Sequence, residues 1–106
     1  MLTSTVTGLP QEVQIKLNSV FKKYPKIEKV VLYGSRAKGN YKKASDIDLT
    51  AIGAQMSLSE FFKLQNEIDD LLLPYKVDLS LFHDLDNENL IDHIKRIGLV
   101  FYEANN

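Results

Sequence analysis

The chain has 106 residues and a mass of 12.1 kDa, the size of one ordinary domain, so residues 1–106 are expected to form a single domain. It contains no cysteine, which excludes disulfides, thiolate metal sites and a cysteine nucleophile, and which is compatible with a reducing cytoplasm. The net charge is −1, with 44% hydrophobic and 25% charged residues, a composition typical of globular rather than disordered chains.

The first predicted element is a helix over residues 10–24. Pro10 suits a first helical turn, apolar residues recur at helical spacing behind it, and Pro25 ends the run. Residues 27–33 are rich in β-branched and aromatic side chains, which predicts a first strand. A second strand is predicted over residues 46–52, because apolar and polar residues alternate strictly there.

A capping box opens the next helix. In Ser57-Leu58-Ser59-Glu60 a serine precedes a glutamate by three residues, and apolar residues continue at helical spacing to Leu72, before Pro74. Alternation returns over residues 75–82 and predicts a third strand. A strand, a long helix and a strand in sequence predict a right-handed crossover, so the second and third strands are expected to be neighbours.

One more helix and an apolar stretch follow the third strand. Asp86 or Asn87 caps this helix, and Gly98 ends it. Residues 99–102 form a short apolar tail that packs either internally or against a second copy of the chain as a homodimer. The order of elements predicts an α/β (α+β) fold with a small mixed β-sheet of three or four strands flanked by helices.

Three aspartates are predicted to converge on one face of this sheet. Asp46 and Asp48 leave the same face of one strand with Cα atoms roughly 6.6 Å apart, and Asp78 lies on the neighbouring strand, roughly 4.8 Å away. Clustered carboxylates repel one another unless a cation neutralises them, and oxygen ligands favour magnesium or manganese over zinc. The alternatives are strand-edge charges that oppose aggregation and, for Asp78, an ordinary ion pair with Lys76.

A glycine-serine turn follows the first predicted strand, opposite these acids. Gly34 permits close approach of backbone N–H groups to an anion, and Ser35 adds a hydroxyl donor at a helix start. Arg36 and Lys38 supply a planar fork and a compact point charge, both suited to phosphate oxygens. A Gly-Ser pair alone is more often a plain turn.

The charges of the chain also divide at this turn. Residues 1–43 contain nine basic and two acidic residues, and the remaining residues contain four basic and twelve acidic ones. Such halves are commonly solvated helix faces. A fold that closes the boundary near residues 34–48 instead places cations beside carboxylates, as a polyphosphate and its metal require.

The turn and the acids have a characteristic spacing, because ten residues separate Gly34-Ser35 from Asp46-Ile47-Asp48. Together with Lys76-Val77-Asp78-Leu79, these segments resemble the nucleotidyltransferase superfamily typified by DNA polymerase beta, and within it the minimal nucleotidyltransferase (MNT) proteins of prokaryotes. The resemblance extends over residues 10–102. It implies a nucleotidyltransferase fold and the transfer of a nucleoside monophosphate, expected to be AMP from ATP, to a hydroxyl group.

Carried over residue by residue, the resemblance implies roles for seven side chains or backbone positions. Two magnesium ions would be bound by the catalytic carboxylates of Asp46 and Asp48, with Asp78 completing the metal site on the acceptor side. The nucleotide-binding residues it implies are Gly34 and Ser35, which hold the β and γ phosphates, and Arg36 and Lys38, which neutralise the triphosphate. Of the last two, Arg36 is expected to contribute more, because a bidentate fork fixes geometry as well as charge.

Two histidines and two tyrosines lie near these segments but are expected to be bystanders. His83 and His93 have no partner at ligand spacing, so both are predicted at the surface without a catalytic role. Tyr33 is expected in the core. Tyr41 is expected to be an exposed loop residue, with a nucleoside contact as the alternative.

The resemblance also implies a partner protein. Stand-alone proteins of this family resemble the antitoxin half of two-component systems, paired with a helical HEPN ribonuclease that some of them silence by attaching AMP to a tyrosine. Catalysis on such a partner and neutralisation of it by contact alone are both open. A third alternative is an aminoglycoside-type transferase, and no module for direct nucleic-acid binding is evident.

A cytoplasmic location without membrane association is expected. No apolar run approaches the roughly 20 residues that cross a bilayer. The first five residues lack the basic start and apolar stretch of a secretory signal.

Overall fold

A four-stranded mixed sheet organises the chain, for which the computed structural model describes residues 7–53 and 55–104. The elements in chain order are α2 (Gln11–Phe21), β1 (Ile27–Tyr33), α3 (Ser35–Lys38), β2 (Ile47–Gly53), α4 (Leu58–Asp69), β3 (Val77–Leu81), η1 (Phe82–Asp84), α5 (Glu88–Ile97) and β4 (Leu99–Glu103). The strand order is β3-β2-β1-β4; β1 is antiparallel to β2 and β4, and β2 is parallel to β3. The expected mixed sheet flanked by helices is confirmed.

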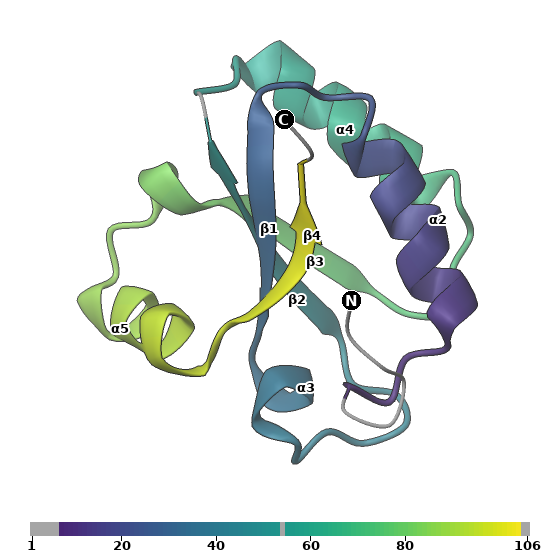
Figure 1. Cartoon of the computed structure of the whole chain (residues 1–106), viewed down its shortest axis with the longest axis vertical. Coiled ribbons are helices and arrows are strands. Elements are labelled where there is room, and N and C mark those ends of the chain that lie inside the picture. Colours follow the sequence, from purple (N-terminus) through teal and green to yellow (C-terminus); the bar gives the residue numbers. More distant parts are fainter. Residues whose placement is uncertain (1–6, 54, 105–106) are drawn as a thin grey trace.

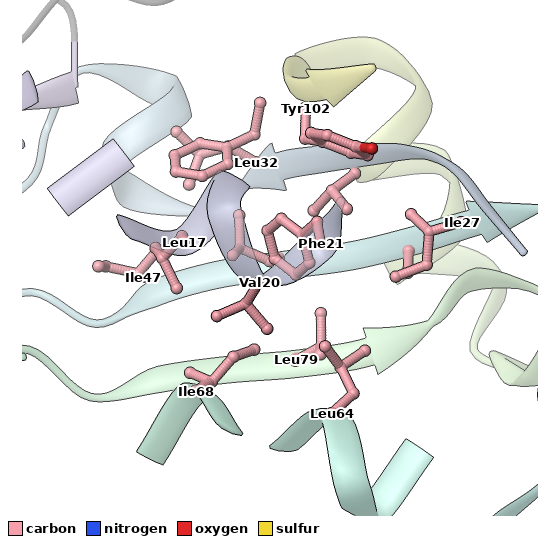
Figure 2. Close-up of a cluster of buried hydrophobic side chains, with 14 of the residues drawn as sticks. Leu17, Val20, Phe21, Ile27, Leu32, Ile47, Leu64, Ile68, Leu79 and Tyr102 are labelled. Carbon is pink, nitrogen blue, oxygen red and sulfur yellow. The ribbon is translucent and has the colours of Figure 1, made fainter. Parts of the chain in front are cut away.

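Helices cover both faces of this sheet (Figure 1). On one face, α2 and α4 pack their apolar residues against all four strands in the main core. Figure 2 shows this cluster, in which Leu17 of α2, Leu64 of α4 and Ile47 of β2 are fully buried. On the opposite face, α5 packs Ile94 against β1 in a second cluster that includes Tyr33.

The alternation in β2 decides which side chains reach each face. Ile47 and Leu49 are buried in the main core, so Asp48 and Thr50 face the α5 side. That side is covered as well, and Thr50 is therefore fully buried. Its hydroxyl oxygen accepts a hydrogen bond from the Ser80 hydroxyl of β3 at 3.0 Å. Asp48, nearer the start of the strand, is only half-buried.

The capping box and the parallel pairing are both confirmed. The Ser57 hydroxyl accepts from the Glu60 N–H at 3.1 Å, and Glu60 Oε1 accepts from the Ser57 N–H at 3.0 Å. Helix α4 ends before Leu72, which has a φ of 53° and therefore cannot continue a right-handed helix. Strand β3 then returns parallel to β2, with Asp78 in register with Asp48.

The apolar tail forms a strand, β4, which pairs antiparallel with β1 at the edge of the sheet. Of the two alternatives for residues 99–102, internal packing holds for Phe101 and Tyr102, which are buried, whereas Val100 is exposed. Across residues 7–53 and 55–104, no helix has both the length and the apolar character to cross a membrane.

Candidate active site

Three polar side chains form a row across neighbouring strands on the α5 face of the sheet. Tyr33 of β1 is in register with Asp48 of β2, and Asp48 is in register with Asp78 of β3. Residues opposite one another in register leave the same face of a sheet, so the three lie side by side. Asp46 lies two residues before Asp48 along the chain and adds a third carboxylate next to this row.

The surroundings of Asp48 perturb its carboxyl group. Burial raises its pKa above the ordinary value, and the charges of Asp78 and Asp46 raise it further. Lys76, and His93 when its ring is protonated, act in the opposite direction and only partly offset this shift. Asp46 and Asp78 are exposed. The effect of both charges on Asp48 shows that Asp46 and Asp78 each lie close enough to repel its carboxylate.

This donor set fits a divalent cation in its chemistry. All three ligands are carboxylate oxygens, which magnesium and manganese prefer, and a bound cation would favour the ionised form of Asp48. Within the described part of the chain, however, no three acidic or histidine side chains are already gathered around a common metal position. Shared binding of one ion therefore requires side-chain rotation, which the exposed Asp46 and Asp78 are free to make.

Tyr33 is the β1 member of the row and is buried, as expected for a core residue. Burial raises the pKa of its hydroxyl above the ordinary value, and the charges of Asp48 and Asp78 raise it further, against a hydrogen bond with Ser80 that lowers it. Tyr33 therefore stays neutral beside the acids at physiological pH.

Gly34 brings the turn after β1 directly against the carboxylate of Asp48. It has φ 76° and ψ −156°, a conformation that glycine adopts readily and other residues rarely do. A Cβ at this position would collide with Oδ2 of Asp48. The glycine is therefore required here by the close approach of backbone to carboxylate as well as by its φ angle.

Ser35 and Lys38 are the first and last residues of the short helix α3 that follows. The Lys38 N–H donates to the Gly34 carbonyl at 3.0 Å, which holds the turn closed. Ser35 is half-buried and Lys38 is exposed. In the described ranges neither side chain has a hydrogen-bond or ion-pair partner, so both are free to bind an anion.

Arg36 does not face the site in the way that phosphate binding requires. Its side chain is 1% exposed. The guanidinium group donates to the Ser45 carbonyl from Nε at 3.2 Å and from Nη2 at 2.9 Å. It also donates to the carbonyls of Thr7 at 2.8 Å and Lys43 at 3.3 Å. Four of its five N–H donors are thus committed to backbone, which points to a structural role instead of the expected contact with a triphosphate.

Two tyrosine rings enclose the same guanidinium group. The Cζ atom of Arg36 lies 5.3 Å from the ring centroid of Tyr41 and 5.1 Å from that of Tyr75, within the range of a cation–π interaction. Tyr41 is half-buried, so the expectation of an exposed loop residue is wrong.

His93 is a residue of the site that the sequence did not reveal. It was expected at the surface, but its ring is half-buried on α5. Its Nε2 atom accepts a hydrogen bond from the Gly34 N–H at 3.1 Å. The ring also packs edge-on against Tyr33, with centroids 6.2 Å apart. His83, by contrast, is exposed as expected.

Comparisons with known proteins identify the family and the fold of this chain. The family model described as "Polymerase beta, Nucleotidyltransferase" matches residues 15–106. No match was found among curated protein sequences.

Several solved structures share the fold. One, described as a toxin-antitoxin with AMP-PNP, matches with a TM-score of 0.67 and 23% identity over 91% of this chain and 75% of the other. An MntA-HepT toxin-antitoxin structure matches with a TM-score of 0.65 and 18% identity, over 90% of this chain and 74% of the other. A third structure is described as a tri-AMPylated HEPN toxin of Shewanella oneidensis in complex with an MNT antitoxin. It matches with a TM-score of 0.59 and 20% identity, over 87% of this chain and 73% of the other. At these identities the likeness establishes a common fold.

Proposed function

Because the chain belongs to the polymerase beta nucleotidyltransferase family, we propose that it transfers AMP from ATP to a hydroxyl group on a partner protein, in a magnesium-dependent reaction. The observation that supports this proposal is the close approach of the Gly34 backbone to Oδ2 of Asp48, with Asp78 in register beside Asp48 and Asp46 near enough to act on its charge. Acids that repel one another beside a turn with a free hydroxyl suit a metal-bound triphosphate.

The three carboxylates would hold the metal ions, Asp46 and Asp48 for both ions and Asp78 on the acceptor side. Magnesium bound there supplies positive charge that acidifies the attacking hydroxyl and stabilises the leaving pyrophosphate. Asp48 is fixed by its burial in β2, whereas Asp78 lies on the edge strand β3, where an acceptor can approach.

The nucleotide would lie along the turn and α3. The Ser35 hydroxyl donates to a phosphate oxygen, and Lys38 neutralises charge from the solvent side, since neither side chain has a partner among residues 7–53 and 55–104. In the reaction the acceptor oxygen bonds to the α-phosphorus, the bond from the α-phosphorus to the bridging oxygen breaks, pyrophosphate leaves, and the hydroxyl proton is released to water.

The partner we propose is a helical HEPN-type protein, and this chain would act as its MNT antitoxin in the cytoplasm, as a single domain of residues 1–106. Support comes from the structural neighbours, which include an MNT antitoxin in complex with a tri-AMPylated HEPN toxin. Neutralisation by contact alone is the competing function for the same pair.

The test is a label-transfer assay with a HEPN-type protein encoded beside this chain. With magnesium and ATP labelled at the α-phosphate, label is expected on the partner; with ATP labelled at the γ-phosphate, none is expected, which separates nucleotidyl transfer from phosphorylation. Absence of α-label transfer in every condition contradicts the proposal. Inhibition of the partner that survives Asp46→Ala and Asp48→Ala supports contact alone.

Gly34→Ala is expected to lower the transfer rate about 10-fold, because its Cβ displaces the Asp48 carboxylate. Gly39→Ala is the matched control, since Gly39 also has a positive φ, of 86°, but a Cβ there meets no atom of the described chain within 4 Å. Both variants carry backbone strain, but the strain is larger at Gly34, whose φ of 76° and ψ of −156° lie in a region essentially confined to glycine, and only this variant also carries the collision. Initial rates at saturating ATP measure the difference; equal rates in the two variants would count against it.

A further inference from the structure

His93 connects α5 to the start of the turn that the proposed function assigns to the nucleotide. Its Nε2 atom accepts from the Gly34 N–H at 3.1 Å, a contact between residues 59 positions apart in the chain. An imidazole nitrogen that accepts is unprotonated, so the ring is neutral and carries its proton on Nδ1. The edge-on packing against Tyr33, at an interplanar angle of 80°, restrains the ring from a second side.

This hydrogen bond changes what Gly34 can contribute. The Gly34 N–H already donates to His93 and is not available to donate to a phosphate. Gly34 therefore contributes through where its backbone lies. Its position matters to two groups at once. Gly34 lies against Oδ2 of Asp48 on one side and precedes Ser35 on the other. A shift of the Gly34 backbone therefore moves the turn relative to the carboxylate.

We propose that His93 is a positioning residue for nucleotide binding: its Nε2 atom anchors the Gly34 backbone, and through it sets the Ser35 hydroxyl relative to the Asp48 carboxylate. This inference rests on the proposed function, because it takes the nucleotide to lie along this turn. It assigns α5 a part in the site in addition to covering the sheet.

Two variants separate the anchoring hydrogen bond from simple packing. In His93→Gln the side-chain amide reaches the position of Nε2 and keeps an acceptor for Gly34. In His93→Asn the amide ends near the position of Nδ1 and cannot reach. His83→Gln, at an exposed histidine outside the site, is the control for the loss of an imidazole.

The expected result is a split between KM and kcat. His93→Asn raises the KM for ATP about fivefold, the effect of losing one hydrogen bond, with a smaller change in kcat. His93→Gln and His83→Gln stay within about twofold of the natural protein. A structural role alone would lower the melting temperature of both His93 variants without this difference in KM.

Binding and NMR keep the inference testable if no transfer is detected. Calorimetric titration of magnesium-ATP should give the same fivefold difference in Kd between His93→Asn and His93→Gln. In ¹⁵N-labelled protein, the Gly34 amide should show a through-hydrogen-bond coupling to His93 Nε2. Equal Kd values for the two variants, no ATP binding by the natural protein, or the absence of that coupling would each overturn the proposal. If no label transfer is detected but the Kd values of the two variants still differ fivefold, the result counts against the transfer reaction only.

Discussion

Asp48→Asn is expected to lower nucleotidyl transfer at least about 100-fold while leaving the protein as heat-stable as before. An amide lacks the negative charge of a carboxylate metal ligand. Even the loss of a residue that only orients a metal ligand lowers metal affinity or activity about 10- to 100-fold. Stability should not fall, because the folded protein already disfavours the ionised carboxylate: burial, then Asp78 and Asp46, raise the pKa of Asp48. The measurements are initial rates with magnesium-ATP and the melting temperature of the same sample.

Asp86→Asn provides the matched control, because Asp86 is an exposed acid outside the carboxylate row. Its rate is expected within about twofold of the natural protein, as is usual for surface substitutions. Transfer by Asp48→Asn at more than a tenth of the natural rate would remove Asp48 from the catalytic set. A large fall in melting temperature would mean that activity was lost through unfolding.

Arg36→Met is expected to destabilise the protein by about 3 kcal/mol or more. The side chain is buried, and its removal leaves the carbonyls of Thr7, Lys43 and Ser45 without four hydrogen bonds. Hydrogen bonds to a charged group contribute about 1.5 to 3 kcal/mol each, although they are not additive. For a domain of this size, the melting temperature should therefore fall by at least about 10 °C.

Lys38→Met changes a basic residue on the same short helix, but an exposed one, and should shift the melting temperature by no more than about 3 °C. ATP affinity is compared at a temperature below the melting range of both variants. This comparison separates a structural role of a basic residue from a phosphate-binding role. Weakened ATP binding by Arg36→Met with an unchanged melting temperature would restore Arg36 to the phosphate site and contradict its structural assignment.

Elements with local signals were predictable from the sequence. The alternation over residues 46–52 sets which face of the sheet each side chain of β2 occupies, because side chains alternate across a strand regardless of the rest of the fold. The capping box at Ser57 and the cap at Asn87, whose side chain accepts from the Leu90 N–H, likewise depend on neighbours within one helical turn. The order strand, helix, strand predicts that β2 and β3 are neighbours, whereas the register that places Asp48 opposite Asp78 is seen only in the folded chain.

Features set by distant contacts could not be predicted in this way. Residues 99–102 have no alternation to mark a strand, and β4 forms because β1 offers an open edge. The burial of Arg36 depends on carbonyls from Thr7 and from residues 43–45, which only the folded chain gathers around it. His93 had one available signal: it lies three residues after Leu90 on α5 and therefore on the apolar side of that helix.

The most direct test of the central claim is paramagnetic broadening by manganese, which substitutes for magnesium at oxygen ligands. In ¹⁵N-labelled protein with ATP present, low manganese concentrations should broaden first the amide signals of residues 34–35, 46–48 and 78, and Asp48→Asn should abolish this pattern. Broadening centred instead on the exposed acids of residues 84–88, or unchanged in Asp48→Asn, would show that the carboxylate row does not gather around a metal-bound nucleotide.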